Sequence, residues 1–220
     1  MYSIVTKDLS VGYKDKMILK SVNINIPRGK ITVIVGPNGC GKSTLVKSLG
    51  RLIRPKSGEI FLGNDSLYKL STLDIARRLA ILPQSPSAPA GLTVGELVEY
   101  GRYPHSNRRL SDKDHEIITW ALDATKLSEL SLKELDTLSG GQRQRAWIAM
   151  ALAQKTDTIL LDEPTTYLDI KYQLEVLELL SRLNKEKGYT IVIVLHDLNL
   201  AARYADYMIA LVEASIFEII

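Results

Sequence analysis

The sequence predicts an α/β fold with a parallel sheet, an antiparallel β layer before it and a helical insertion within it. Three observations lead to this prediction. A glycine-rich loop at 36–44 connects an apolar strand at 31–35 to a helix. Apolar runs at 158–161 and 190–195 end in polar residues, as buried parallel strands do. Residues 85–153, which precede these runs, show helical patterns.

Length and composition describe an ordinary globular chain. Of its 220 residues, 45% are hydrophobic and 24% are charged, enough for one large core or a core with a small subdomain. The 28 Lys and Arg residues nearly balance 25 Asp and Glu residues, so the net charge of +3 does not indicate a nucleic-acid partner. A weak attraction to anionic lipid is allowed.

We expect neither a secretory signal nor a membrane span. Residues 1–10 carry Lys7 and Asp8 within an alternating pattern. The longest nearly apolar stretch, 208–220, contains two glutamates and is too short to cross a bilayer. If the protein works at a membrane, another subunit must provide the span. A single cysteine excludes an internal disulfide framework and fits a reducing compartment.

The N-terminal residues predict the antiparallel β layer. Residues 4–9 and 17–26 have the pattern of strands, and the second alternates apolar with polar residues. A turn at 27–30 then leads into the strand at 31–35. Tyr13 falls in the connection between the first two strands, where its ring could stack on a nucleotide base, although a loop tyrosine is more often a surface residue.

The loop at 36–44, here called the phosphate loop, fits the pattern G-x-x-x-x-G-K-[ST]. Its three glycines let successive backbone N–H groups point at phosphate oxygens, and the helix at 43–52 adds the positive end of its dipole. Lys42 would reach the β- and γ-phosphates, and the Ser43 hydroxyl would ligate Mg²⁺. The alternative is a glycine turn that binds nothing, but the strand before, the helix after and the Gly-Lys-Ser triplet argue against it. The expected contacts are Gly36, Pro37, Asn38, Gly39, Cys40, Gly41, Lys42, Ser43 and Thr44.

Cys40, the only thiol, lies inside this loop. The N–H groups around it and Lys42 would make the thiol reactive. We therefore expect a bulky alkylating reagent to block the phosphate loop.

The segment before the insertion predicts a strand at 59–62 and a short helix at 71–80, which starts with Ser71 in capping-box spacing. A buried strand at 80–84 follows and ends in Gln84. A glutamine at the end of a strand is weak evidence on its own, because most such residues only cap a loop.

Proline and glycine residues then break the chain, and helices at 93–100 and 111–126 follow. The loop between them, 101–105, is basic and aromatic. His105 and His115 have no carboxylate or cysteine partner at metal-ligating spacing, so we expect both at the surface.

Residues 138–145, here called the LSGGQ segment, open a helix that runs to about residue 153. Its paired glycines, Gly140 and Gly141, predict a second anion-binding helix end. Standing alone, the segment would indicate only a glycine helix start without a ligand.

Two carboxylates, Asp162 and Glu163, follow the buried strand at 158–161, at the edge where parallel sheets place their ligands. Adjacent side chains on a strand point to opposite sides, so the two cannot make the same contact. Asp162 fits a Mg²⁺ shell through water, and Glu163 fits a base that positions an attacking water.

After a long helix at 170–187, the buried strand at 190–195 delivers His196 to the sheet edge that also carries Lys42 and Glu163. A histidine at a strand end is usually structural. Here it is expected within reach of a γ-phosphate.

In this order the motifs resemble the nucleotide-binding subunit of ATP-binding cassette (ABC) transporters, over nearly the whole chain. The resemblance implies a single ABC ATPase domain over residues 1–220. Its P-loop NTPase core, which is RecA-like and includes the antiparallel layer, would comprise 1–84 and 154–220, and its helical subdomain 85–153. It also implies hydrolysis of ATP with Mg²⁺, coupled to transport, at the cytoplasmic face of the cell membrane.

The resemblance implies a role for each matching residue. The catalytic residues would be Lys42, Gln84, Glu163 and His196. The ligands and sensors of Mg²⁺ would be Ser43, Gln84 and Asp162. Besides the phosphate loop, the residues in contact with ATP would be Tyr13 on adenine, Asp169 at a dimer seam, and Ser139, Gly140, Gly141 and Gln142 on the ATP of the opposite subunit.

The implied partners are a second copy of the chain, membrane-spanning permease subunits and an extracytoplasmic substrate-binding protein, with no nucleic acid. Residues 101–104 and 194–201 look like the importers of iron(III)–siderophore complexes, haem and vitamin B12. Arg102 and Tyr103 are candidate contacts with the permease. The alternatives are an ABC ATPase for another transport substrate, and a non-transport soluble ABC protein.

One feature departs from the family pattern. Members usually continue past the strand at 207–211 with a glycine-containing hairpin turn, a strand and a helix, whereas residues 212–220 contain no glycine. We expect a truncated or altered C-terminal end. The chemistry should survive, because the expected catalytic residues all precede it.

Overall fold

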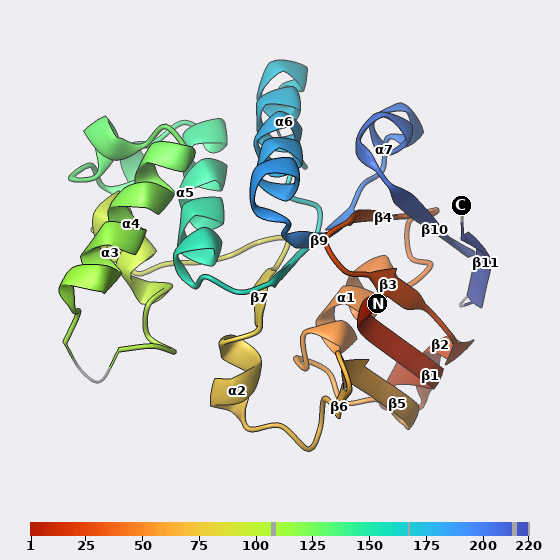
Figure 1. The fold of residues 1–220 in the computed structure, drawn as a ribbon. Coiled ribbons are helices and arrows are strands. Elements are labelled where there is room, and N and C mark those ends of the chain that lie inside the picture. Colours follow the sequence, from red (N-terminus) through yellow and green to blue (C-terminus); the bar gives the residue numbers. More distant parts are fainter. Residues whose placement is uncertain (107–108, 167, 213–214, 220) are drawn as a thin grey trace.

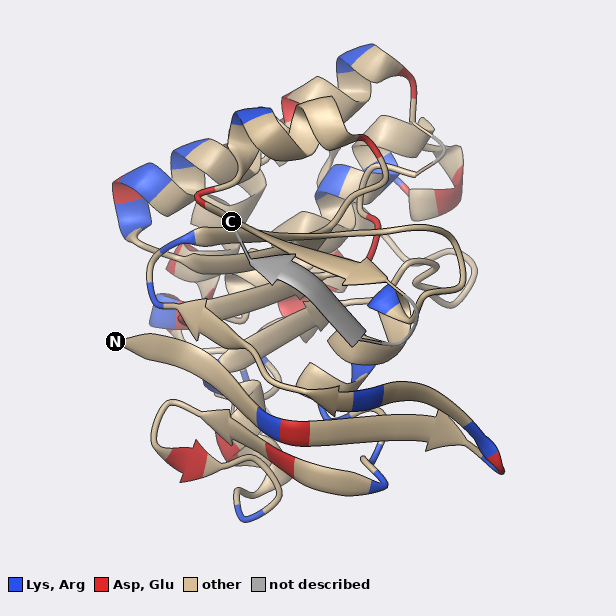
Figure 2. Ribbon diagram, turned by 90° about the vertical axis from the view of Figure 1, so that its right-hand side faces the viewer, with Lys and Arg blue, Asp and Glu red and all other residues tan. Residues whose placement is uncertain are grey.

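The computed structural model describes residues 1–106, 109–166, 168–212 and 215–219. Its centre is a six-stranded sheet with the strand order β11-β10-β4-β9-β8-β7. Helices α3, α4 and α5 gather beyond one end of this sheet, and the antiparallel β layer lies towards the other (Figure 1). Turned by 90°, the molecule shows long helices on one side of the sheet and the antiparallel layer on the other, with basic and acidic residues interspersed (Figure 2).

Five strands of the central sheet run parallel. These strands are β4 (Ile31–Val35), β7 (Leu79–Leu82), β8 (Thr158–Leu161), β9 (Thr190–Val194) and β10 (Tyr207–Val212). In β4, β8 and β9 no position is exposed, which explains their continuous apolar runs, because both faces of a parallel sheet are covered.

The antiparallel layer has five strands. They are β1 (Tyr2–Tyr13), β2 (Lys16–Val22), β3 (Asn25–Pro27), β5 (Ser57–Leu62) and β6 (Asp65–Ser66). The single strand predicted over 17–26 is wrong: the chain breaks between β2 and β3, and each pairs with β1. Tyr13 was also misplaced, since it ends β1 opposite Lys16 instead of lying in the connection.

The helices α1 to α6 agree with the predicted ones, apart from some of their ends, whereas α7 was not predicted. They are α1 (Lys42–Leu49), α2 (Thr72–Ala76), α3 (Val94–Tyr100), α4 (Asp112–Ala124), α5 (Gly140–Ala153), α6 (Ile170–Lys187) and α7 (Leu198–Tyr204), with short 3₁₀ turns at Ser128–Leu130 and Leu135–Thr137. Helix α2 ends four residues earlier than predicted, because β7 begins at Leu79. Capping boxes start α3, α4 and α5, which fixes where the chain turns into each helix.

Two apolar cores lie on the two faces of the central sheet. One joins side chains of the sheet to helices α3, α4, α5 and α6. The other joins the sheet to α1 and the antiparallel layer. The strand ends that carry Gln84, Asp162 and His196 are therefore held from both sides.

The C-terminal end forms one further strand. Strand β11 (Ser215–Ile219) pairs antiparallel with β10, so a strand follows β10 without the glycine of the family pattern. Residues 213 and 214 lie outside the described residues. Among the described residues, no helix is both long and apolar enough to cross a membrane.

Candidate functional site

The phosphate loop needs its glycines for two physical reasons. Gly36, Gly39 and Gly41 all have positive φ angles, of 146°, 79° and 109°. A Cβ on Gly36 would also lie 2.2 Å from the backbone oxygen of Leu211 in β10. A side chain at this position would collide with the sheet, so the loop can curl only with glycine there.

Lys42 is folded back into the loop that it belongs to. Its side chain is buried, and its Nζ donates hydrogen bonds to the carbonyl oxygens of Gly36 at 2.8 Å and Pro37 at 3.0 Å. The ammonium group thus lies inside the curl of the loop, beside the start of α1. A positive charge and a helix N-terminus meet at one point, which is the arrangement that binds phosphate.

Ser43 and Asp162 meet although they are far apart in the sequence. The Ser43 hydroxyl donates to Oδ1 of Asp162 at 2.9 Å. The other carboxylate oxygen, Oδ2, is buried and has no hydrogen-bond partner among the described residues. Burial raises the pKa of Asp162, and the hydrogen bond from Ser43 opposes that shift. A buried, incompletely paired carboxylate beside a hydroxyl suits a hard cation such as Mg²⁺.

The carboxylate of Glu163 lies at the centre of a hydrogen-bonded cluster. Its Oε2 accepts from the Gln84 amide nitrogen at 2.6 Å and from the Thr166 hydroxyl at 3.0 Å. Its Oε1 lies 2.8 Å from Nε2 of His196. The structure therefore brings together three predicted site residues, Gln84, Glu163 and His196, from the ends of β7, β8 and β9. Thr166 was missed, and only its position three residues after Glu163 could have indicated it.

The backbone of Glu163 is strained. Its φ angle is +53°, in the left-handed region that residues with a side chain rarely adopt. Strain of this kind persists where surrounding contacts over-determine the conformation, and it clusters at functional sites. The contacts that Gln84, Thr166 and His196 make with the Glu163 carboxylate are a suitable cause.

The LSGGQ segment lies elsewhere on the molecule. Ser139 caps α5 by accepting from the Gln142 backbone, and a Cβ on Gly141 would come within 2.9 Å of the Tyr172 ring on α6. Asp169, the N-cap of α6, is exposed, as are Ser139 and Gly140. Within the described residues, no hydrogen bond or ion pair joins this segment to the phosphate loop.

The expectation about Cys40 changes, whereas that about Tyr13 does not. The thiol of Cys40 is only 8% exposed and packs in the core beneath the antiparallel layer, so the structure gives no support for easy alkylation. Tyr13 remains exposed, at the tip of β1, where an aromatic ring is open to a planar ligand.

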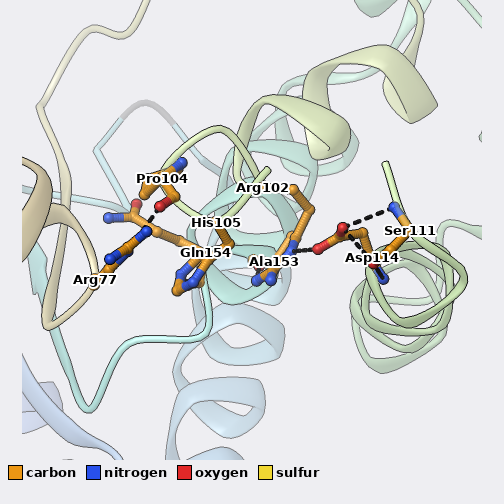
Figure 3. Close-up of polar contacts among 8 residues, drawn as sticks. All are labelled: Arg77, Arg102, Pro104, His105, Ser111, Asp114, Ala153 and Gln154. Carbon is orange, nitrogen blue, oxygen red and sulfur yellow. Dashed lines mark hydrogen bonds and ion pairs between the residues drawn. The ribbon is translucent and has the colours of Figure 1, made fainter. Parts of the chain in front are cut away.

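Of the two candidate contacts with the permease in the loop 101–105, Tyr103 is exposed and Arg102 is buried. Arg102 is not a surface residue: its Nε donates to Asp114 at 2.8 Å and its Nη1 to the Ala153 carbonyl at 2.7 Å (Figure 3). His105 is half-buried, with Nε2 2.8 Å from the Gln154 carbonyl, so the expectation of a surface histidine was also wrong. Tyr103 is 64% exposed and stacks at 5.0 Å on Tyr100.

Comparisons with known proteins identify relatives of this chain. The family model for the ABC transporter matches residues 19–166. The chain is 55% identical over 220 residues to the iron(3+)-hydroxamate import ATP-binding protein FhuC of Bacillus subtilis. This match covers 99% of this chain and 82% of that protein. It is 50% identical over 212 residues to the ferric enterobactin transport ATP-binding protein FepC of Escherichia coli. That match covers 96% of this chain and 78% of that protein.

Solved structures confirm the predicted fold. The dimeric structure of MJ0796, a bacterial ABC transporter cassette, matches with a TM-score of 0.87 and 31% identity, over 99% of this chain and 97% of that chain. The post-hydrolysis state of that cassette, bound to ADP and Pi, matches with a TM-score of 0.85 over the same shares. The sequence relatives span this chain almost completely, and the phosphate loop, the carboxylate pair and the LSGGQ segment all occur in it. The chain therefore belongs to the ABC transporter family, as one of its ATP-binding subunits with ATPase activity.

Proposed function

We propose that this chain hydrolyses ATP to power the import of an iron(III)–siderophore complex. Two relatives that are at least half identical to it are named for the import of iron(3+)-hydroxamate and the transport of ferric enterobactin. These names favour an iron chelate over haem or vitamin B12. The other subunits of such a system would choose the chelate.

Phosphate binding in this proposal falls to the loop between β4 and α1. Its backbone N–H groups would surround the phosphates of ATP, Lys42 would exchange its bonds to loop carbonyls for the β- and γ-phosphates, and Tyr13 would stack on adenine. Ser43 would hold Mg²⁺, with Asp162 acting through water and Gln84 as a further ligand. When bound, Mg²⁺ neutralises charge on the phosphate oxygens.

The reaction in this proposal depends on the position of Glu163. Its carboxylate would accept a proton from, or orient, the water that attacks the γ-phosphate, while His196 contacts that phosphate. The observation that carries the proposal is the convergence of Gln84, Thr166 and His196 on this one carboxylate. Groups held in place before the reaction lower the reorganisation that the transition state requires.

A pair of these chains would form the working unit. The chain has two helix starts suited to phosphate, at the phosphate loop and at the LSGGQ segment, and no described polar contact joins them. The exposed Ser139, Gly140 and Asp169 would therefore meet the ATP of a partner copy across a two-fold axis. The related cassette MJ0796 is known as a dimer, which supports this arrangement.

The loop 101–105 would face the permease, at the cytoplasmic side of the membrane. Tyr100 and Tyr103 form an exposed aromatic pair, and aromatic residues are enriched where proteins meet. Arg102 would support this surface from below without touching the partner. A substrate-binding protein outside the cell would complete the system.

Glu163→Gln tests the proposed chemistry. The amide keeps the shape of the side chain but cannot accept the proton, so ATP should bind as before while turnover falls by about 10²-fold or more. Glu186→Gln, the same change at an exposed position on α6, is the control and should turn over normally. ATPase activity of purified Glu163→Gln within a few-fold of wild type would refute the role of this carboxylate.

A further inference from the structure

The three partners of the Glu163 carboxylate differ in how they are attached to it. Gln84 follows β7 and His196 follows β9, so their contacts depend on the relative positions of separate segments. Thr166 lies in the same turn as Glu163. Its backbone N–H donates to the Glu163 carbonyl at 3.3 Å, and its hydroxyl donates to the Glu163 carboxylate at 3.0 Å.

This difference decides which contact can persist during the reaction. In the proposed function Gln84 turns to Mg²⁺ and His196 to the γ-phosphate, and neither can then hold the carboxylate as it does here. The hydroxyl of Thr166 has no such competing role. Because it is fixed to Glu163 by a closed turn of four residues, its contact does not depend on how the sheet edge rearranges.

We propose that Thr166 is a positioning residue for ATP hydrolysis, and that it holds Oε2 of Glu163 so that Oε1 faces the attacking water. The proposal rests on the proposed role of Glu163. A carboxylate rotates easily about its last torsion angle, which has broad preferences. A hydrogen bond to one oxygen removes that freedom at the point where orientation matters most.

The expected effect is on turnover and not on substrate binding. Thr166→Val keeps the shape of the side chain and removes the hydroxyl, so kcat should fall by about tenfold, the size of one hydrogen bond to a charged group. KM for ATP should stay within about twofold, because Thr166 is absent from the phosphate loop. Thr166→Ser restores the hydroxyl and should recover most of kcat.

The experiment measures ATPase kinetics of the full chain for Thr166→Val, Thr166→Ser and Thr165→Val. Thr165 provides the matched control: it undergoes the same change one residue earlier, and its hydroxyl makes no hydrogen bond to Glu163 in the described residues. If Thr166→Val does not fold, Thr166→Ala replaces it, and thermal unfolding of every variant shows that the fold is kept.

A double-mutant cycle with Glu163→Gln separates positioning from a structural role. If Thr166 acts through the carboxylate, Thr166→Val should have little further effect on the single-turnover rate of Glu163→Gln. The same tenfold loss in that background, a kcat near wild type for Thr166→Val, or no recovery in Thr166→Ser would each overturn the proposal. If Glu163→Gln is inactive but Thr166→Val is normal, only this proposal fails; if Glu163→Gln is fully active, the proposed function fails with it.

Discussion

The buried ion pair between Arg102 and Asp114 offers the sharpest test of how the helices α3, α4 and α5 are held together. Only 6% and 8% of the two side chains are exposed. Arg102 also donates to the Ala153 carbonyl at the end of α5, and Ser111 donates to the other oxygen of Asp114 (Figure 3). We therefore expect Arg102→Met, which is similar in volume, to destabilise the fold strongly.

The magnitude follows from the groups left behind. After Arg102→Met, Oδ1 of Asp114 and the Ala153 carbonyl lose their partners while they stay buried, although Ser111 still supports Oδ2. Removing one partner of a buried pair costs about 3–5 kcal/mol. Since Ser111 remains, we expect the lower end, about 3 kcal/mol, or roughly 6–12 °C in the midpoint of thermal unfolding for a chain of this size.

Urea unfolding of the purified chain measures this loss. The matched control is Arg28→Met, because Arg28 pairs with Asp157 at the same distance of 2.8 Å but with 54% and 73% of the side chains exposed. Surface pairs contribute about 0–1 kcal/mol, so the control should change little. An equal loss in both variants, or a loss below about 1 kcal/mol for Arg102→Met, would refute the assignment of Arg102 as the buried support of loop 101–105.

The same pair predicts a dependence on pH. Hydrogen bonds from Ser111 and then Arg102 hold the pKa of Asp114 well below its usual range. A carboxyl with a lowered pKa stabilises the folded state fully above its unfolded pKa of about 4, and this contribution is lost as the pH falls towards the folded pKa. The free energy of unfolding should therefore drop below about pH 4, and Asp114→Asn should make that drop shallower.

Two further predictions concern partners. Mixing a Lys42→Ala chain with a Ser139→Arg chain should restore part of the ATPase activity that each lacks alone, because one of the two shared sites then has an intact phosphate loop and an intact LSGGQ segment; no recovery at any ratio would exclude a shared site. Tyr103→Ala should lower transport in proteoliposomes with the permease while the isolated chain hydrolyses ATP normally, because the ring is exposed and Tyr103 is not among the residues expected to contact ATP; unchanged transport would place the contact elsewhere.

Motifs with a local cause were predictable from the sequence. The phosphate loop, the helix start at Ser71 and the buried run of β9 depend on residues within a few positions of each other, and the structure has all of them. The break between β2 and β3 was not visible, because the alternating pattern continues through it. The break is set by how β2 and β3 each pair with β1, and strand pairing cannot be inferred from the sequence of one segment alone.

Side-chain partners across the sheet could be predicted only as a shared edge. The order of polar residues after β7, β8 and β9 placed Gln84, Glu163 and His196 at that edge, but it did not show that one carboxylate joins them. Arg102 shows the opposite failure. A basic residue in a polar, aromatic loop has the appearance of a surface contact, and only the approach of α4 and α5 to the same point reveals that it is buried.

These two outcomes have one physical origin. A charged side chain can be buried only where a partner is in place, and the partner usually comes from another element. At Arg102 the partner is Asp114 on α4, and their ion pair stabilises the loop that carries the exposed tyrosine pair. At Glu163 one partner, Thr166, lies on the same turn, and the other two, Gln84 and His196, follow neighbouring strands. Gln84 and His196 each have a second role in the proposed reaction. Whether a buried charge serves the fold or the chemistry therefore depends on whether its partners are free to leave it. Of the three partners of Glu163, Thr166 is the one that is not free to leave.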